Sequence, residues 1–221
     1  MYKNFIKRLI DIILSGIAII ILALPMLIVA IIIKIDYPGP VLFKQKRIGR
    51  NKKGEICYFM IWKYRSMKMC TPHDTPTHLL ENPDQYITRI GKFIRKTSID
   101  ELPQIYQVFT GHLSCVGPRP ALWNQVDLWE ERQKYGANDI KPGITGWAQI
   151  NGRDELEIPV KAKFDGEYTA AINAGIFKGI AMDIKCLFGT VISVLKSDGV
   201  VEGGTGEMKK QKEIKKEMAG K

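Results

Sequence analysis

The chain has 221 residues, enough for one domain or for one domain with an appendage, and its apolar share of 45% excludes global disorder. The net charge of +10 favours anionic partners such as nucleic acid, anionic lipid or phosphorylated substrates. The four cysteines lie far apart without a C-x-x-C motif, which predicts reduced thiols in a cytosolic compartment and neither disulfides nor a metal framework.

An uncharged and mostly aliphatic stretch runs from Ile12 to Ile33. As a helix it would be about 33 Å long, enough to cross the hydrocarbon core of a bilayer. It is too long for the apolar region of a signal peptide. Because it is apolar on every face, it favours a membrane segment over a buried helix of a soluble domain.

The residues leave open whether this segment crosses the membrane. Lys7 and Arg8 precede it, and Lys34 and a basic segment at 44–53 follow it, so both flanks prefer the cytoplasmic side. Pro25 lies near the middle and removes one backbone hydrogen bond, which bends a helix. A full crossing and a helix–break–helix hairpin that returns to the same leaflet are both compatible with this pattern. In either case the larger excess of cations after the segment places the body in the cytoplasm.

A turn cluster at 36–40 forms a natural boundary after the membrane segment. Two strands are expected next, over 41–43 and 56–62, joined by the basic segment 44–53 as a turn that contacts anionic headgroups. Lys63 and Arg65 close the second strand. Residues 68–88 have no periodicity and predict a surface loop, whose two histidines lack further ligands in register for a metal site.

The stretch around Asp100 and Glu101 places two adjacent carboxylates at the expected start of a helix. Pro103 belongs in a first helical turn, which favours Asp100 as the N-cap, and the apolar spacing over 102–109 predicts a helix that stops at Gly111. In one interpretation the acids only cap the helix, since Ser98 and Glu101 also fit a capping box. In the other, Asp100 is an ionised carboxylate that faces a phosphate site, and Glu101 holds a divalent metal beside it.

Two further loops carry residues suited to anion binding. Arg119 stands between two prolines, and an arginine on a stiff loop can bind phosphate oxygens through both of its terminal nitrogens. The glycine-rich loop at 141–153 offers Trp147 as a stacking face and Arg153 as a second anion contact, without matching a Walker A or dinucleotide-binding motif. Helices are expected at 121–135 and 160–197, the latter with Asp183 inside an apolar run. Residues 206–221 predict a frayed helix or a disordered tail.

These elements predict an α+β, mainly helical fold in three parts: a membrane segment at 1–36, a cytosolic domain with a small β-hairpin at 37–205, and a basic tail at 206–221. The motifs that occur in order are Lys7-Arg8-Leu9-Ile10-Asp11, the apolar segment kinked at Pro25, Pro38-Gly39-Pro40-Val41, Lys63-Tyr64-Arg65-Ser66-Met67, Asp100-Glu101-Leu102-Pro103-Gln104, Gly117-Pro118-Arg119-Pro120, and Gly146-Trp147-Ala148-Gln149-Ile150-Asn151-Gly152-Arg153. In this order they resemble the bacterial sugar transferase family, the small monotopic phosphoglycosyltransferases, over residues 3–195.

The resemblance implies an enzyme that moves a sugar 1-phosphate from a UDP-sugar to undecaprenyl phosphate and releases UMP, at the start of polysaccharide or glycoconjugate assembly. It implies that Asp100 is the nucleophile of a covalent phosphosugar intermediate and that Glu101 binds Mg²⁺. It further implies a re-entrant membrane hairpin broken at Pro25, in the bacterial inner membrane with the catalytic domain on the cytoplasmic face.

Other roles follow from combining the resemblance with residue chemistry. Candidate contacts of the substrate phosphates are Arg119, Arg153, Lys63 and Arg65. Candidate contacts of the polyprenyl phosphate and of anionic lipid are Lys7 and Arg8. Candidate contacts of the uridine or the sugar are Gly146, Trp147, Gln149 and Asn151. A homo-oligomer is compatible with the sequence.

The chain departs from the family pattern in two places. The kink is Leu24-Pro25 where many relatives have Ser-Pro, and residues 165–182 are rich in alanine and glycine, so no sugar contacts are assigned there. The alternative function is a membrane-anchored basic module that binds nucleic acid or anionic lipid, but it leaves the carboxylate pair unexplained and lacks aromatics interleaved with basic residues. An enzyme with several membrane spans would need more than one apolar segment.

Overall fold

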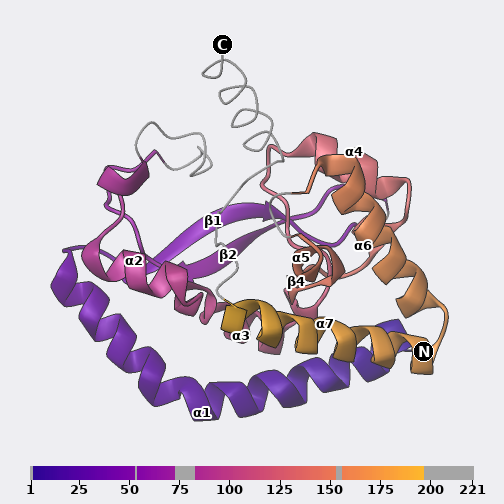
Figure 1. Cartoon of the computed structure of the whole chain (residues 1–221), viewed down its shortest axis with the longest axis horizontal. Helices are drawn as coiled ribbons and strands as arrows, with labels where there is room; N and C mark the ends of the chain where they lie inside the picture. Colours follow the sequence, from indigo (N-terminus) through magenta and orange to yellow (C-terminus); the bar gives the residue numbers. More distant parts are fainter. Residues whose placement is uncertain (1, 53, 73–82, 153–155, 197–221) are drawn as a thin grey trace.

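The longest element is helix α1 (Lys7–Asp36), which follows a π-helical turn, η1 (Tyr2–Ile6). The computed structural model describes residues 2–52, 54–72, 83–152 and 156–196, and in it α1 bends and passes along one side of a body of shorter helices and two small sheets (Figure 1). Pro25 lies inside α1. Most aliphatic side chains of α1 are exposed, and among the described helices α1 alone is long and apolar enough to cross a membrane.

The N-terminal arm of α1 is bound to the body by buried polar contacts. Lys7 Nζ lies 2.7 Å from Asp183 Oδ2, and both side chains are nearly inaccessible to solvent. One turn later, Asp11 Oδ1 accepts hydrogen bonds from Ser114 Oγ at 3.1 Å and from the Cys115 backbone N–H at 2.9 Å. Because a buried polar group without its partner is costly, these contacts hold the arm to the body.

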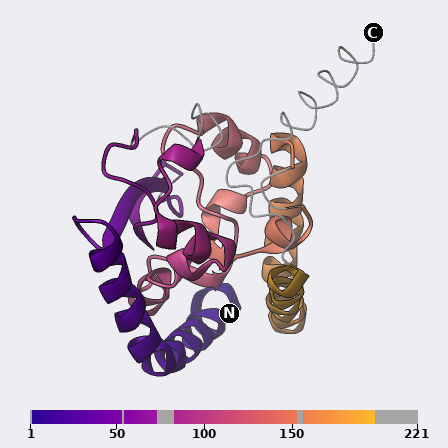
Figure 2. The ribbon, with the colours of Figure 1, turned by 60° about the vertical axis from the view of Figure 1, so that its left-hand side comes forward.

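The C-terminal arm of α1 is bound to the same body. Tyr64 Oη donates to the Met26 carbonyl at 2.8 Å, immediately after the proline kink. The Arg65 guanidinium donates to the Pro38 carbonyl at 2.8 Å and to the Tyr37 carbonyl, just past the helix end. Cations favour the C-terminal end of a helix, where backbone carbonyls are left without helical partners. Both arms of α1 are therefore attached to one body on the concave side of the bend (Figures 1 and 2).

The larger sheet is an antiparallel hairpin of β1 (Leu42–Ile48) and β2 (Tyr58–Tyr64). The predicted boundaries were wrong, since part of the basic segment at 44–53 belongs to β1 and not to a turn. Lys44 and Lys46 alternate with more buried residues, and this period of two places them on the outer face of the hairpin. Their ammonium groups lie over Trp62 and Tyr58, at 5.6 and 4.3 Å from the ring centroids.

A second sheet, which the sequence analysis did not predict, pairs β3 (Ser114–Val116) with β4 (Gly143–Thr145) in parallel. The backbones approach closely at Gly143, which is part of this pairing, and at Gly117, which follows β3. A Cβ on Gly143 would lie 2.1 Å from the Gly117 nitrogen, and a Cβ on Gly117 would lie 2.4 Å from the Lys141 carbonyl oxygen. Only glycine fits at these two positions.

The remaining elements are helical, as the predicted mainly helical α+β class requires. They are η3 (Pro83–Gln85), α2 (Arg89–Lys96), η4 (Ile99–Glu101), α3 (Gln104–Thr110), α4 (Val126–Gln133), η5 (Ala137–Asp139), α5 (Trp147–Ile150), α6 (Ile158–Asn173) and α7 (Ile176–Lys196). The helix predicted at 121–135 is shorter, and the one predicted at 160–197 is two helices separated at Gly175, whose φ of 122° breaks the helix. The predicted tail at 206–221 and residues 73–82 of the predicted loop lie outside the described residues.

The core beneath the sheets joins distant parts of the chain. One buried cluster contains Tyr2, Val116, Tyr168, Ile172 and Cys186, so the N-terminal turn packs against β3, α6 and α7. This cluster surrounds the buried Lys7–Asp183 pair, to which the Tyr2 and Tyr168 hydroxyls also donate. The start of α1 is thus part of the core of the body.

Candidate functional site

The carboxylates of Asp100 and Glu101 lie in η4, a single turn between α2 and α3. The predicted N-cap at Asp100 was wrong, because α3 begins at Gln104 and Asp100 lies inside η4. Ser98, the N-cap of η4, makes no side-chain cap hydrogen bond, so the predicted capping box is not formed either. The predicted stop at Gly111 is confirmed, with a φ of 88°. Ser98 has a φ of 56°, the one positive value at a non-glycine residue in the described part of the chain. Such a conformation costs on the order of 1–3 kcal/mol and is concentrated at functional sites.

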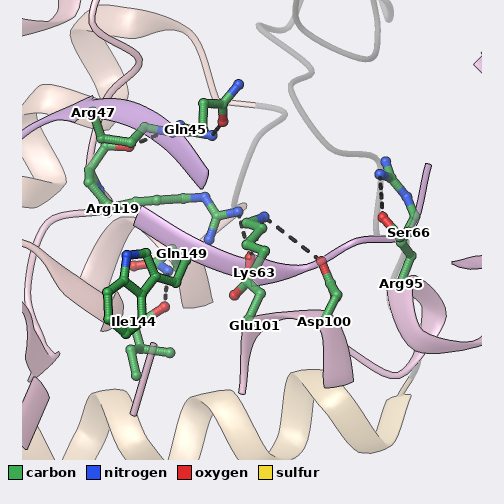
Figure 3. Close-up of polar contacts among 12 residues, drawn as sticks. Gln45, Arg47, Lys63, Ser66, Arg95, Asp100, Glu101, Arg119, Ile144 and Gln149 are labelled. Carbon is green, nitrogen blue, oxygen red and sulfur yellow. Dashed lines mark hydrogen bonds and ion pairs between the residues drawn. The ribbon is translucent and has the colours of Figure 1, made fainter. Parts of the chain in front are cut away.

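The two carboxylates share their surroundings with two cations (Figure 3). Lys63 Nζ lies 3.0 Å from Glu101 Oε1 and 3.9 Å from Asp100 Oδ2. Arg119 Nη2 lies 3.1 Å from the same Glu101 Oε1. The four side chains are between 5% and 21% exposed. The structure therefore brings together four of the predicted site residues from three separate segments.

The ionisation of Glu101 follows from these contacts. Burial by itself would raise the pKa of the Glu101 carboxyl, but the charges of Lys63 and Arg119 and their hydrogen bonds outweigh it and hold the pKa well below its ordinary value. Glu101 is thus an ionised carboxylate in a largely desolvated site. A strongly perturbed carboxyl beside specific charged partners is typical of a functional site.

Gln107 of α3 positions Lys63, and sequence reasoning missed it. Its Oε1 accepts from the Trp62 backbone N–H at 2.9 Å, and its Nε2 donates to the Met60 carbonyl at 2.6 Å. The amide thereby occupies the edge of β2 as a neighbouring strand would. Since α3 follows the carboxylates directly, this link sets the distance between Lys63 and Glu101. The signal in the sequence that could have identified Gln107 is its polar side chain between apolar residues of a short helix.

The tight glycine packing at the ends of β3 and β4 positions Arg119. The Gly117 N–H donates to the Thr145 carbonyl at 2.7 Å, and a Cβ on Gly146 would lie 2.2 Å from the Gly117 carbonyl oxygen. On the other side, Arg47 Nη1 donates to the Pro120 carbonyl at 3.1 Å. Arg47 was assigned to a headgroup-contacting turn, but it lies beside Arg119 and supports that loop (Figure 3).

Three predicted cations are placed away from the carboxylate pair. Arg65 binds the C-terminal end of α1, and Lys7 forms its buried ion pair in the core. Arg8 donates to the Val108 and Phe109 carbonyls at 2.6 and 2.7 Å, at the C-terminal end of α3. The structure thus engages all three in holding α1 to the body, and it does not bring them to the candidate site.

Of the contacts predicted in the loop after β4, Gln149 lines the pocket at the site, whereas Trp147 and Asn151 do not. Trp147 Nε1 donates to Glu167 Oε2 at 2.8 Å, and Lys185 lies 4.3 Å from the ring centroid, so the indole packs against α6 and α7. Asn151 Nδ2 donates to the Trp147 carbonyl at 2.8 Å. Arg153 lies outside the described residues.

A pocket of about 180 Å³ adjoins the carboxylates and is lined by Glu101, Arg119 and residues of α3, β4, α5 and α7. Gln149 of α5 lies in its wall. The Gln149 Nε2 donates to the Ile144 carbonyl at 2.7 Å, whereas its buried Oε1 has no hydrogen-bond partner among the described residues. A buried acceptor without a partner is rare and indicates a position where a ligand or water donates a hydrogen bond.

The donor set fits a magnesium ion only together with a substrate. The described residues contain no group of three or more His, Cys, Asp or Glu side chains that could hold a metal. Mg²⁺ is, however, bound in phosphate-transferring sites through one or two carboxylates plus substrate phosphates. Asp100 and Glu101, both within 4.0 Å of Lys63 Nζ, supply that number of carboxylates.

The arrangement can therefore bind a phosphorylated ligand and offer it a nucleophile. Arg119 and Lys63 supply positive charge for phosphate oxygens, and the adjacent carboxylates supply an oxygen nucleophile and a metal ligand. Nothing comparable to a histidine-based acid–base pair lies among the described residues of the pocket wall.

Comparison with known proteins agrees with this chemistry. A family model described as bacterial sugar transferase matches residues 2–197. The chain is 37% identical over 196 residues to the UDP-glucose:undecaprenyl-phosphate glucose-1-phosphate transferase of Escherichia coli (strain K12), a match that covers 86% of the chain and 40% of that protein. It is 39% identical over 202 residues to the exopolysaccharide production protein PSS of Rhizobium leguminosarum bv. phaseoli, covering 86% of the chain and 95% of that protein.

A third relative is the UDP-N-acetylgalactosamine-undecaprenyl-phosphate N-acetylgalactosaminephosphotransferase of Aeromonas hydrophila, 34% identical over 200 residues. The match covers 88% of the chain and 45% of that protein. The chain thus spans less than half the length of the two relatives here whose names state a reaction, and nearly the whole length of the PSS protein.

Proposed function

The chain belongs to the bacterial sugar transferase family, and on that premise we propose that it transfers a sugar 1-phosphate from a UDP-sugar to undecaprenyl phosphate and releases UMP. The observation that carries the proposal is the pair of adjacent carboxylates, Asp100 and Glu101, held beside Lys63 and Arg119 at a pocket. A basic module that only binds lipid or nucleic acid does not require an ionised, desolvated Glu101 between two cations, because the carboxylate neutralises part of their positive charge.

The proposed reaction has two displacement steps at one phosphorus. In the first, a carboxylate oxygen of Asp100 attacks the phosphorus that bears the sugar, and the bond from that phosphorus to the bridging oxygen breaks, so UMP leaves with this oxygen and its electron pair. In the second, a phosphate oxygen of the lipid attacks the same phosphorus, and the bond to Asp100 breaks. Covalent catalysis of this kind divides one transfer between two bulky partners into two simpler steps.

The other residues of the site act on charge and alignment, which dominate phosphoryl transfer. Arg119 would bind non-bridging phosphate oxygens through its fork, and Lys63 would place a point charge beside the reacting carboxylate. Glu101, kept ionised by its two cations, would hold Mg²⁺ together with the diphosphate. When bound, the metal would neutralise charge on the diphosphate and on the departing UMP.

We further propose that α1 enters and leaves the same leaflet. The support is the attachment of both arms to one body: Lys7 and Asp11 hold the first arm, and Met26 and Tyr37 hold the second. A helix fixed in this way cannot place its two ends on opposite sides of a bilayer without releasing its buried polar contacts. The bend at Pro25 then brings the carboxylates close to the level of lipid phosphates.

The catalytic proposal is tested by UMP release from UDP-glucose or UDP-N-acetylgalactosamine in detergent, with Mg²⁺ and undecaprenyl phosphate. Asp100→Asn should abolish release, because an amide cannot form the acyl phosphate. Asp139→Asn, at an exposed site in η5, is the matched control and should retain wild-type activity. Turnover of Asp100→Asn near the wild-type rate would exclude the covalent route.

The topology is tested by labelling with a membrane-impermeant maleimide. Asn4 and Cys70 are both exposed, on opposite sides of α1 in the sequence. In the re-entrant arrangement, Asn4→Cys and the native Cys70 are both labelled in inverted inner-membrane vesicles and both protected in spheroplasts. Labelling of Asn4→Cys in spheroplasts would show that α1 crosses the membrane.

A further inference from the structure

The pocket beside the carboxylates has one wall whose chemistry differs from that of the phosphate-binding end. It is lined by Leu102 just after η4, Ile105 of α3, Ile144 of β4 and Ile150 of α5. Glu101 and Arg119 line the same pocket and supply its charged groups. The pocket therefore joins an aliphatic surface to the point at which phosphorus is to be attacked.

Two of the hydroxyl groups in the pocket lining are satisfied within the protein, whereas Ser98, Gln149 and Ser193 add further polar side chains to it. Thr145 Oγ1 and Thr190 Oγ1 lie 2.5 Å apart, and Thr190 Oγ1 also donates to the Cys186 carbonyl at 2.7 Å. Since these two hydroxyls satisfy one another and the backbone, the four aliphatic side chains of the wall form most of the surface between α3 and α7. The Gln149 Oε1, which has no partner among the described residues, is left to accept from a water, because a prenyl chain has no donor.

The chemistry of the wall distinguishes between the two substrates of the proposed reaction. A UDP-sugar is covered with hydroxyl, phosphate and amide groups, and burying such groups against aliphatic side chains without hydrogen bonds is costly. Its size also exceeds a pocket of about 180 Å³, which lies below the usual range for whole drug-sized ligands. The prenyl chain of the acceptor is the one extended apolar group that either substrate carries next to a phosphate.

The surroundings of the pocket connect this wall to the apolar exterior. On α3, Ile105 lines the pocket while Tyr106 and Phe109 are exposed, and Phe109 faces Gly16 of the membrane helix α1. On α7, the exposed Val191 and Ile192 lie between two lining residues. Figure 2 shows α7, in gold, on the side of the body away from the β1–β2 hairpin, and residues of both α3 and α7 line the pocket.

We propose that this pocket receives the first isoprene units of the acceptor lipid, with its phosphate directed to Arg119. The assignment rests on the proposed function and adds to it the site at which the acceptor binds. The lipid would reach the carboxylates from the membrane side between α3 and α7, and the polar donor would approach from the side of the β1–β2 hairpin, where Arg47 of β1 and Lys63 of β2 lie (Figure 3).

The first test separates the two half-reactions. Ile105→Thr and Ile144→Thr each replace part of an aliphatic side chain by a hydroxyl, and each should raise the KM for undecaprenyl phosphate about tenfold, the effect of removing one hydrocarbon group from an apolar site. The KM for UDP-glucose and the burst of UMP released without lipid should stay at wild-type values. Val126→Thr, at an exposed position of α4 that is not part of the pocket lining, is the control and should change neither.

Two results would overturn the assignment. A raised KM for UDP-glucose, or a smaller UMP burst, with the KM for undecaprenyl phosphate unchanged would mean that the pocket holds the donor. An unchanged KM for undecaprenyl phosphate in both variants would mean that the wall does not contact the chain.

A second measurement uses the wild-type protein and requires no catalytic turnover. A prenyl phosphate with a photoreactive group in its first isoprene unit should label peptides from 102–105 or 144–150 of the wild-type protein. Labelling confined to α1 would contradict the assignment. If the probe labels these peptides in a protein that releases no UMP, the proposed function would be refuted, while the assignment of the pocket to a prenyl chain would be retained.

Discussion

Replacing Lys63 by methionine removes one of the two cations that contact Glu101, a cation that also lies 3.9 Å from Asp100. The lost contact is a charge-assisted hydrogen bond of 3.0 Å between side chains 11% and 12% exposed. Contacts of this kind contribute about 2–3 kcal/mol, and Arg119 remains on the same oxygen, so we expect no larger effect. At about 1.4 kcal/mol per decade this corresponds to a loss of roughly 30- to 150-fold in kcat/KM.

The contribution of the Lys63–Glu101 ion pair can also be measured from the pH dependence of kcat/KM in Lys63→Met. In the wild type the pKa of Glu101 in the folded protein lies below its ordinary value. The ionised carboxylate therefore stabilises the fold fully at pH values above the pKa of the unfolded chain, and this stabilisation is lost as the pH falls through the pKa of the folded protein. Without Lys63, Arg119 alone opposes the effect of burial, and the pKa of Glu101 rises. The acidic limb of kcat/KM should therefore move to higher pH.

The assay is UMP release under saturating undecaprenyl phosphate across a range of pH, compared with Lys44→Met. Lys44 lies on the outer face of the same hairpin and is exposed, so its replacement makes the same charge change outside the site. We expect Lys44→Met to stay within twofold of the wild type. If Lys63→Met also stays within threefold and keeps the wild-type acidic limb, the ion pair does not contribute to catalysis.

Three other perturbations test the supporting structure. Asp183→Asn leaves the buried Lys7 without its counter-charge, and denaturant unfolding in detergent should show a loss of about 3–5 kcal/mol; a loss below 1 kcal/mol would contradict the attachment of α1. Gly117→Ala places a Cβ 2.4 Å from the Lys141 carbonyl oxygen and should lower kcat/KM at least tenfold by displacing Arg119. The control Gly16→Ala, whose Cβ would have its nearest atom at 3.6 Å, should keep wild-type activity. Equal activities of the two variants would exclude the positioning of Arg119 by Gly117. Chelation with EDTA should abolish UMP release and excess Mg²⁺ should restore it, and release in EDTA would remove the metal from the proposal.

The features that sequence reasoning obtained correctly are those determined by local chemistry. The length of the apolar run from Ile12 to Ile33 predicts a long helix, and α1 is that helix. The predicted break at Pro25 was wrong, because α1 continues through the proline and only bends. The conformational freedom of glycine predicts the end of α3 at Gly111. The grouping of Asp100 and Glu101 with Arg119 came from the family resemblance together with the stiffness that two prolines give to one loop.

The features that it missed depend on contacts between distant segments. β3 and β4 are three residues each, too short for a pattern of alternation, and their pairing depends on the glycines that let the backbones approach. Lys7 and Asp183 are 176 residues apart, so nothing near Lys7 in the sequence shows that it faces the core. The same holds for Arg65, whose charge alone equally suits a phosphate or the carbonyls at a helix end.

The central claim, that Asp100 carries the phosphosugar between donor and acceptor, is tested most directly by mass spectrometry of the protein after exposure to UDP-glucose and Mg²⁺ without lipid. We expect a mass increase of one hexose phosphate on the peptide that contains Asp100, and loss of that increase when undecaprenyl phosphate is added. Turnover without any such adduct, or UMP release that requires the lipid from the first cycle, would contradict it.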